Sequence, residues 1–453
     1  MAKQSISGFP EWLPEGRTVE VFVQDTLRRV FELHGFSGIE TRAVEPLSAL
    51  ESKGETSKQV YLLERLQSVR EEATKGISVT EPTGRDLGLH FDLTVPLARY
   101  VLKNANELSF PLRRYQIQKV WRGERPQEGR FREFTQADID IIGFDTLSFH
   151  HEVEAARVML DALGQLGIPP VLMEVNNRRL LQGLVAAAGI EDFEGTLRGL
   201  DKLDKIGPDG VSEELRAGGL SEAQISQVIA IAQISTDSAD ELRIRVAELG
   251  LSNDLVHRGL NELCELLIGA SNSAPGQVRA SLRIARGLDY YTGSVYETVI
   301  PGYESLGSIC SGGRYDTLVS EGRRTYPGVG LSIGVTRLVS LILSERLLVA
   351  SRPSPSVVMV AVTSEDERAA SDRVAAALRN RGVNCEVAPS AQKFGKQIRM
   401  AEKRGIPFVW FPGDNQESGQ VKDIRSGDQI EADAMSWLPP KEDLLVRVTP
   451  PKA

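Results

Sequence analysis

Four segments of this 453-residue chain concentrate side chains that can bind anions or position a substrate. They are Asp92–Pro96 (DLTVP), Arg122–Asp140 (RGERPQEGRFREFTQADID), Arg286–Gly293 (RGLDYYTG) with the following Ser311–Asp316 (SGGRYD), and Gly328–Arg337 (GVGLSIGVTR). Arginine occurs in three of them. A guanidinium is permanently charged and pairs bidentately with phosphate or carboxylate, so converging arginines suit a triphosphate that gains charge during reaction. Alternatively, each arginine forms a solvated surface pair, which contributes little free energy.

Glycines recur in the last of these segments. Gly328, Gly330 and Gly334 lie where an apolar run predicts a strand leading into a helix, a place where glycine is costly. Close approach of a ligand to the backbone explains them, and so does close helix packing. Their spacing is not GxGxxG, and the chain has no GxxxxGK[ST], so neither a dinucleotide fold nor a P-loop is supported. An ATP site here must follow another scheme.

Two of the segments carry polar or aromatic side chains whose direction can be inferred from strand geometry. Gln136, Asp138 and Asp140 share one face of a predicted half-buried strand, because side chains alternate with period two. That face meets either solvent or a pocket, and the pattern by itself favours solvent. Tyr290 and Tyr291 are adjacent, so on a strand one lines a pocket while the other packs in the core.

Several kinds of chemistry are not indicated. The five histidines show no HExxH or paired spacing, and no GxSxG elbow or other evident nucleophile is present. Cys264, Cys310 and Cys385 are far apart and odd in number, and no CxxC occurs, which argues against a disulfide framework or a zinc site. We therefore assign no metal ligands among the side chains and expect a phosphate-handling enzyme without a covalent intermediate.

Composition is that of an ordinary globular protein with two or three domains, 41% apolar and 25% charged. The net charge of −9 bears on solubility rather than function. Locally the balance reverses, because Pro111–Arg132 holds seven basic and two acidic residues, as a groove for phosphates would. The N-terminus lacks a basic segment followed by an apolar run, and no stretch of about 18 uncharged apolar residues occurs. We expect a cytoplasmic protein without a membrane partner.

Hydrophobic periodicity predicts the elements that must position these side chains. In chain order they are a helix over 17–34 ended by Gly35, a strand over 36–44, strands on either side of a polar loop over 121–133, a helix over 149–166, helices over 175–272, strands over 278–318, and a strand running into a helix over 329–347.

A linker-like cluster, Arg352–Ser356, precedes a change of pattern. Strands are predicted over 357–362, 383–387 and 407–411, with helices between them. Ser364 and Glu367 have the spacing of a capping box at the first of these helices. Alternation of strand and helix predicts a small three-layer α/β domain.

Taken together, these motifs resemble those of the histidyl-tRNA synthetases. Phe91–Tyr100 resembles the family's histidine-binding segment, and SGGRYD its glycine-rich segment. RGLDYYTG is similar to its histidine signature. Arg122–Gly143 resembles class II motif 2, and Gly328–Leu338 resembles motif 3. The C-terminal region, which includes Lys393–Gln397 and Val421–Gly427, resembles the family's anticodon-binding domain. The resemblance covers nearly the whole chain, and the histidine signature together with motif 2 is its most specific part.

The resemblance implies an α+β fold: a six-stranded antiparallel catalytic sheet with a helical insertion, and a C-terminal α/β anticodon-binding domain. The implied domains are 1–174 (catalytic core with motifs 1 and 2), 175–272 (helical insertion), 273–350 (catalytic core with the histidine signature and motif 3) and 356–453 (anticodon-binding domain). A homodimer through motif 1 is also implied. The chain departs from the family there, because the proline that is usual near Arg42 is absent, as is the family's N-terminal Gly-Thr-Arg-Asp stretch.

The implied activity is that of a histidine–tRNA ligase. It activates L-histidine with ATP to histidyl-adenylate, releasing pyrophosphate, and transfers the histidyl group to the 3′ end of tRNA(His). ATP is a substrate and carries Mg²⁺. The implied catalytic residues are Arg286 and Arg122. The implied histidine-binding residues are Asp92, Leu93, Thr94, Arg122, Gln136, Asp140, Arg286, Tyr290 and Tyr291. Arg122, Arg130, Gln136 and Arg337 are implied for ATP, and Arg125 and Gln127 for the tRNA acceptor end.

Two other functions compete with this one. Some relatives of the family act without aminoacylation, as a regulatory subunit of ATP phosphoribosyltransferase, and these lack the anticodon domain. A synthetase-like RNA sensor is the third possibility. The chain keeps Arg122, Arg286 and Arg337 and continues well beyond the linker, which favours the enzyme.

Overall fold

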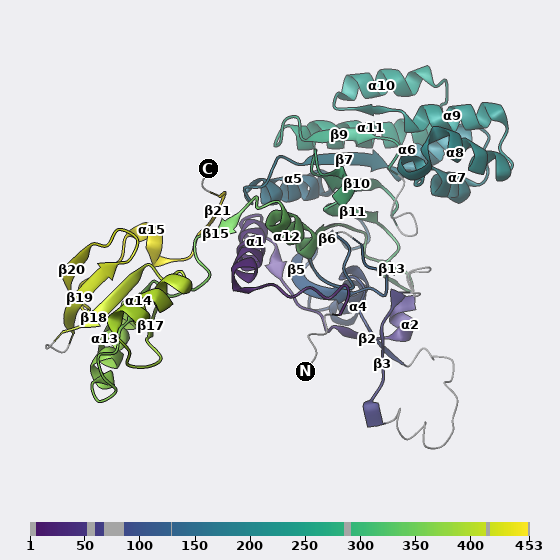
Figure 1. The fold of residues 1–453 in the computed structure, drawn as a ribbon. Coiled ribbons are helices and arrows are strands. Elements are labelled where there is room, and N and C mark those ends of the chain that lie inside the picture. Colours follow the sequence, from purple (N-terminus) through teal and green to yellow (C-terminus); the bar gives the residue numbers. More distant parts are fainter. Residues whose placement is uncertain are drawn as a thin grey trace. The chain divides into compact units, whose positions relative to one another are not determined.

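The computed structural model describes residues 6–51, 59–67, 86–127, 129–284, 291–413 and 417–451, and the chain divides into two compact units. Unit 1 takes Val23–Leu341 together with the N-terminal residues up to Pro10. Unit 2 takes Glu11–Phe22 and the chain from Ile342 onward. Each unit has a sheet of its own (Figure 1).

The centre of unit 1 is a nine-stranded sheet. In spatial order its strands are β1 (Ser37–Gly38), β5 (Leu112–Trp121), β6 (Glu133–Ile142), β14 (Gly328–Gly334), β11 (Cys310–Tyr315), β10 (Ser294–Val299), β7 (Leu172–Asn177), β9 (Val278–Ser281) and β8 (Ser235–Thr236). The six strands from β5 to β7 pair antiparallel throughout. The expected antiparallel sheet is confirmed, and it is longer than expected because β1 and β9 add parallel pairs at its two ends and β8 extends it.

Strand register decides which side chains share a face of this sheet. Asp140 on β6 lies opposite Arg114 on β5 and Gly330 on β14, and Gly330 in turn lies opposite Gly313 on β11. Directly opposed residues point to the same face. One face therefore carries the polar side chains of β6, while Ile139 and Ile141 point to the other, apolar face.

Helix α5 (His150–Gly164) covers the apolar face. Glu152 on this helix is fully buried and accepts hydrogen bonds from Arg314 of β11 and from the backbone N–H of Ser294 on β10. The hydroxyl of Tyr296 donates to the Glu152 carbonyl oxygen. Because α5 occupies this side, the polar face is left to line a cavity.

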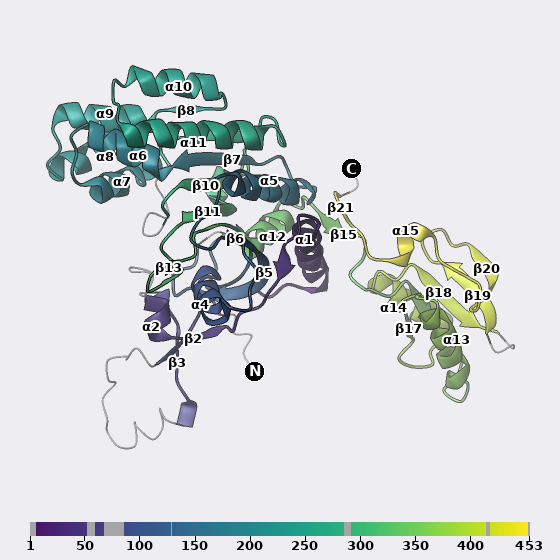
Figure 2. The ribbon, with the colours of Figure 1, turned by 180° about the vertical axis from the view of Figure 1, so that it is seen from behind.

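Most of the other elements of unit 1 are helices. Their bounds are α1 (Pro14–Leu33, shared with unit 2), α2 (Leu47–Leu50), α4 (Thr94–Asn104), α6 (Arg178–Ala187), α7 (Phe193–Leu200), α8 (Leu203–Ala217), α9 (Glu222–Ala232), α10 (Ala239–Glu248), α11 (Asp254–Ser271), the 3₁₀ turn η2 (Glu304–Leu306) and α12 (Val335–Ser344, shared with unit 2). Helices α6 to α11 gather beyond β7, as Figures 1 and 2 show from opposite sides. The predicted helical insertion is thus helical, although β8 within it joins the main sheet.

Asn177 shows how this insertion is attached. It is the last residue of β7, and its side chain accepts hydrogen bonds from the backbone N–H groups of Arg179 and Leu180. These donors have no partner inside the helix, so the asparagine caps α6 and turns the strand directly into it.

The glycines of β14 have a cause that the sequence did not indicate. A Cβ on Gly330 would lie 2.0 Å from Oδ1 of Asp140, and one on Gly328 would lie 2.4 Å from the ring of Tyr315. Space for side chains of neighbouring strands, rather than helix packing, requires glycine at both positions. A Cβ on Gly334 would meet nothing closer than 3.6 Å, and this residue borders a cavity.

Unit 2 contains a five-stranded sheet between two helices. The sheet order is β17 (Cys385–Val387), β16 (Val358–Val360), β18 (Phe408–Pro412), β19 (Ser418–Asp423) and β20 (Gln429–Asp433). Val358 and Val360 pack with Leu378 of α13 (Arg368–Asn380), whereas Met359 packs with Ala401 of α14 (Phe394–Lys403). Alternate residues of one strand thus meet different helices, which confirms the predicted three layers.

Shorter elements complete the two units. They are a small sheet of β2 (Val44–Pro46), β4 (Leu87–Leu89) and β3 (Leu62–Leu63), the hairpin β12 (Ser320–Glu321) with β13 (Arg324–Thr325), the pair β15 (Val349–Ala350) with β21 (Val448–Thr449), and α15 (Lys441–Leu444). No helix in the described part of the chain is both long and apolar enough to cross a bilayer.

Three local predictions were wrong. The strand expected over 36–44 is two short strands, β1 and β2, in different sheets. The predicted half-buried strand, β6, is buried along most of its length. Helix α5 covers one face, and the other face lines an internal cavity instead of meeting bulk solvent. The expected capping box is absent, since α13 starts at Arg368 and its N-cap residue, Glu367, makes no side-chain cap.

Two arginines of the sheet pair with two glutamates of α5, and they allow a matched stability test. The Arg314–Glu152 pair is nearly dry, with side chains 11% and 1% exposed, whereas the Arg113–Glu154 pair is 27% and 29% exposed. Burial already raises the pKa of Glu152 despite its partner.

We expect Arg314→Met to lower the free energy of unfolding by roughly 3–5 kcal/mol, because it leaves a buried carboxylate unpaired. Arg113→Met should cost no more than about 1 kcal/mol, because water solvates Glu154. Urea unfolding followed by circular dichroism measures both. Equal losses in the two variants would contradict this ranking.

Candidate active site

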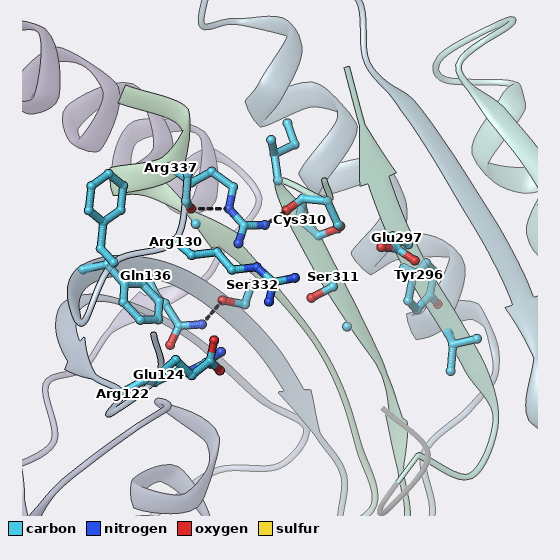
Figure 3. Close-up of a pocket in the computed structure, with 18 of the residues that line it drawn as sticks. Arg122, Glu124, Arg130, Gln136, Tyr296, Glu297, Cys310, Ser311, Ser332 and Arg337 are labelled. Atoms are coloured by element: carbon cyan, nitrogen blue, oxygen red, sulfur yellow. Dashed lines mark hydrogen bonds between the residues drawn. The ribbon is translucent and has the colours of Figure 1, made fainter. Parts of the chain in front are cut away.

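Two adjoining cavities open on the polar face of the main sheet. The larger has a volume of about 380 Å³ and the smaller about 100 Å³. The residues that border both are Arg122, Gln136, Tyr291, Ser311 and Ser332. They come from the β5–β6 loop and from β6, β11, β14 and the segment before β10, so the sheet register assembles them (Figure 3).

The larger cavity is lined by three arginines. The Nε of Arg122 donates to the Phe91 carbonyl oxygen at 2.9 Å, and its guanidinium lies 5.1 Å from the centre of the Phe134 ring. The Nε of Arg337 donates to the Gly129 carbonyl oxygen at 2.8 Å, and its Nη1 to that of Ser308. Carbonyl oxygens orient a guanidinium without neutralising it, so these contacts fix the direction of both groups toward the cavity they line.

Arg130 completes this group. It is exposed and borders the larger cavity, and Figure 3 shows it extending toward the same space as Arg337 and Ser332. Three cations from one loop and one helix can bind several oxygens of one polyphosphate. Two carboxylates, Glu124 and Glu297, also line this cavity.

The smaller cavity is lined by acids and hydroxyls. Gln136, Asp138 and Asp140 of β6 are 9%, 3% and 3% exposed and border it, together with Asp92 and Thr94 near the start of α4. The expectation that the polar face of this strand meets solvent was therefore wrong, and the pocket alternative was right. The pattern along one strand could not reveal what covers it.

Asp140 is held by two residues that the sequence analysis did not assign to the site. Its Oδ2 lies 2.5 Å from the guanidinium of Arg114, which is fully buried, and its Oδ1 accepts a 2.6 Å hydrogen bond from the hydroxyl of Tyr315. A buried carboxylate stays ionised only with such partners. The only signal for Arg114 is its position opposite Asp140 across β5 and β6, and this requires the register.

Asp138 is the third residue that the sequence analysis left unassigned. Burial raises the pKa of its carboxyl to about 7, and the charges of Asp140 and Asp92 add to this, whereas Arg114 and a hydrogen bond with Ser332 act the other way. Ser332 also accepts a 2.8 Å hydrogen bond from Nε2 of Gln136. Gln136, Ser332 and Asp138 thus form one chain of hydrogen bonds along the cavity wall.

Tyr291 separates the two cavities and borders both. Its ring lies where a Cβ on Gly313 would approach within 2.7 Å, so glycine at this position makes room for the tyrosine. The residue that follows, Thr292, is anchored by a 2.6 Å hydrogen bond from its hydroxyl to Oδ2 of Asp316. The SGGRYD motif therefore contributes support for the site: Gly313 by its size, Arg314 through Glu152, and Asp316 through Thr292.

Five predicted site residues are not among those that border the two cavities. Arg286 and Tyr290 fall outside the described residues. Leu93 is fully buried and borders neither cavity, although it is flanked by Asp92 and Thr94, which border the smaller one. Arg125 and Gln127 are exposed on the β5–β6 loop and border neither cavity. In the described ranges no group of three or more histidine, cysteine, aspartate or glutamate side chains is placed to hold a metal ion.

Comparisons with known proteins agree with this geometry. Residues 8–338 match the family model described as histidyl-tRNA synthetase, and residues 356–436 match the one described as anticodon binding domain. A protein from Cutibacterium acnes named histidine–tRNA ligase is 55% identical over 97% of each chain. Another of that name, from Micrococcus luteus, is 54% identical over 98% of each chain.

A solved structure agrees as well. The crystal structure of histidyl-tRNA synthetase from Nostoc sp. PCC 7120 superposes with a TM-score of 0.81 at 34% identity, covering 96% of this chain and 97% of that one. The family match spans both cavities and the sheet beneath them. The chain belongs to the histidyl-tRNA synthetase family.

Proposed function

We propose that this chain is a histidine–tRNA ligase, which activates L-histidine with ATP and transfers the histidyl group to the 3′ end of tRNA(His). The observation that carries this proposal is the meeting of two cavities of opposite character at Arg122 and Gln136. One suits a polyphosphate and the other an amino acid, so their common border is where a carboxylate would reach an α-phosphate. Relatives named histidine–tRNA ligase match the chain almost end to end.

In the first step an oxygen of the histidine carboxylate attacks the α-phosphorus of ATP, and pyrophosphate leaves. Arg122 borders both cavities, so its guanidinium would hold the carboxylate and the α-phosphate together. Arg130 and Arg337 would bind the outer phosphates. The family resemblance assigns Arg286 to the charge that develops at the α-phosphate. Orientation and fixed positive charge lower such a barrier without a nucleophile on the protein.

Mg²⁺ neutralises phosphate charge when it is bound with ATP, and it takes one or two carboxylates with several water or phosphate oxygens. The carboxylates of Glu124 and Glu297 line the larger cavity, so its donor set fits this pattern. Glu124 or Glu297 would supply the protein's carboxylate to the ion.

The smaller cavity would bind the amino acid. Its α-amino group would meet Asp92, Thr94 and Gln136, whose Oε1 lacks a hydrogen-bond partner among the described residues. Leu93 would contribute through the same segment. The imidazole would lie near Asp140 and one of the tyrosines, Tyr290 or Tyr291. Tyr291 borders the cavity, which supports its part in this.

In the second step the terminal ribose hydroxyl of tRNA(His) attacks the adenylate, and AMP leaves. Arg125 and Gln127 are exposed on the loop beside the larger cavity, where an acceptor end could reach them. In unit 2, Phe394 is 41% exposed and is flanked by exposed Lys393 and Lys396. An aromatic ring beside cations suits unstacked anticodon bases.

The remaining proposals concern organisation. The catalytic core would occupy 1–174 and 273–350, the helical insertion 175–272, and the anticodon-binding domain 356–453. The enzyme would act in the cytoplasm as a homodimer, without a membrane partner. The alternative, a regulatory subunit of ATP phosphoribosyltransferase, is disfavoured because the chain matches an anticodon-binding model over residues 356–436. A non-catalytic RNA sensor is disfavoured by Arg122 and Arg337, which line the larger cavity.

Arg122→Met tests the first step. It keeps the apolar stem of the side chain over Phe134 and removes the charge, so histidine-dependent ATP–pyrophosphate exchange should fall at least about 100-fold. Arg113→Met is the control, because Arg113 lies on the same hairpin, pairs with Glu154 and borders neither cavity. Exchange that is reduced equally in both variants would refute the role of Arg122.

Truncation after Ser351 tests the role of the C-terminal region. Adenylation depends on unit 1, whereas anticodon binding would depend on the removed residues. We therefore expect charging of tRNA(His) to fall at least about tenfold more than pyrophosphate exchange, since losing a binding module weakens tRNA affinity. Gel filtration and circular dichroism establish that the truncated chain is folded. Equal losses in both reactions would argue against a separate anticodon module.

A further inference from the structure

Two carboxylates border the smaller cavity from the same strand, and their surroundings differ. Asp140 meets Arg114 through one oxygen and the Tyr315 hydroxyl through the other. Asp138 is equally buried, but its Oδ1 has no hydrogen-bond partner in the described part of the chain. Buried polar atoms in folded proteins are nearly always paired, so an unpaired one calls for an explanation.

Neither Ser332 nor Gln116, the residues opposite Asp138 on the neighbouring strands, is bonded to its Oδ1. Ser332, opposite it on β14, lowers the pKa of the Asp138 carboxyl as a hydrogen-bonding neighbour, yet Oδ1 is left without a partner in the described ranges. Gln116 lies opposite Asp138 on β5, but its Nε2 donates its hydrogen bonds to Thr41 and Gln118 instead. The Oε1 atoms of Gln116 and Gln136 are themselves unpaired acceptors. Nε and Nη1 of Arg114 are unpaired donors nearby, but neither is bonded to Asp138 Oδ1, so this oxygen remains an acceptor without a donor among the described residues.

From this we infer that Asp138 is a specificity-determining residue, whose free oxygen accepts a hydrogen bond from a ring N–H of the bound histidine. The inference rests on the proposed function and adds a residue to it. Imidazole always carries at least one N–H donor, whereas an aliphatic or phenyl side chain carries none. An amino acid without the donor would leave Asp138 buried and unpaired, and such a site rejects its wrong substrates strongly.

The charges around Asp138 are consistent with this role. Arg114 favours the carboxylate form, while Asp140 and Asp92 oppose it, so the group changes charge near neutral pH in the empty site. A ring N–H bound to it favours the carboxylate, because only that form offers both oxygens as acceptors. Histidine binding should therefore strengthen as pH rises through neutrality. Replacement by asparagine should remove this dependence and leave only the titration of histidine itself.

The test is histidine-dependent pyrophosphate exchange by Asp138→Asn, with Glu174→Gln as the control. Glu174 is also a buried acid of the main sheet, 7% exposed, but it pairs with Arg283 and borders neither cavity. We expect the KM for histidine to rise at least about tenfold in Asp138→Asn, the cost of one hydrogen bond to a charged group. The KM for ATP should stay unchanged, and the control should keep both constants.

The pH profile supplies a second readout. The ratio of wild-type to Asp138→Asn kcat/KM for histidine should increase between pH 6 and pH 8, a window centred on the pKa of about 7. An unchanged KM for histidine in a folded Asp138→Asn variant, with a flat ratio, would show that the carboxyl is protonated and only structural.

A third experiment uses only the wild-type enzyme, so it remains informative even if the Asp138→Asn variant does not fold. The wild-type enzyme is offered L-histidine methylated at either ring nitrogen. The analogue that lacks the recognised N–H should be activated at least about tenfold less well than histidine. Equal activation of histidine and both analogues would overturn the proposal. Absence of any exchange with histidine would instead refute the proposed function.

Discussion

The register of β6 between β5 and β14 is the constraint on which the active site depends. It places Asp140 opposite Arg114 on one side and Gly330 on the other. The first pairing gives a buried carboxylate a cationic partner, and the second leaves room for it, since a Cβ at Gly330 would lie 2.0 Å from its oxygen. A slip of one residue would turn the polar side chains of β6 into the apolar layer beneath α5. Side-chain contacts among β5, β6 and β14 thus fix the register in which these three strands pair.

Charge is separated across the same surface. The larger cavity is lined by three arginines, and backbone carbonyl oxygens orient two of them, Arg122 and Arg337. The smaller cavity is lined by acids, one of them neutralised by Arg114 and another beside it only partly compensated. A substrate with both a carboxylate and an ammonium group is oriented by such a gradient, because each end is drawn to the opposite sign. Arg122 and Gln136 border both cavities, so they lie where the arginine-lined surface meets the acidic one.

Buried charge elsewhere in unit 1 supports the site without lining it. Arg314 connects β11 with Glu152 of α5, and Asp316 holds Thr292, which lies near the end of the segment similar to the histidine signature. Asp316 also lies 3.5 Å from Arg179 of α6, which pairs with Glu262 of α11. Contacts therefore run from the helical insertion to the residues beside the cavities. Of the SGGRYD motif, only Ser311, Gly312 and Tyr315 border a cavity. Its other residues support the elements around the cavities.

The sequence by itself determined the chemistry. Arg122, Arg130 and Arg337 are recognisable by type and context, and all three line one cavity; Asp92, Thr94, Gln136, Asp140 and Tyr291 line the other. The strand–loop–strand pattern around them is local, and local periodicity is enough to predict it. Only the tertiary structure decided that Arg114 and Tyr315 hold Asp140, that β14 needs glycine, and that Asp138 is buried with an unpaired oxygen. Each of these depends on which residues face one another across strands far apart in the chain, and periodicity along a single strand carries no information about its neighbours.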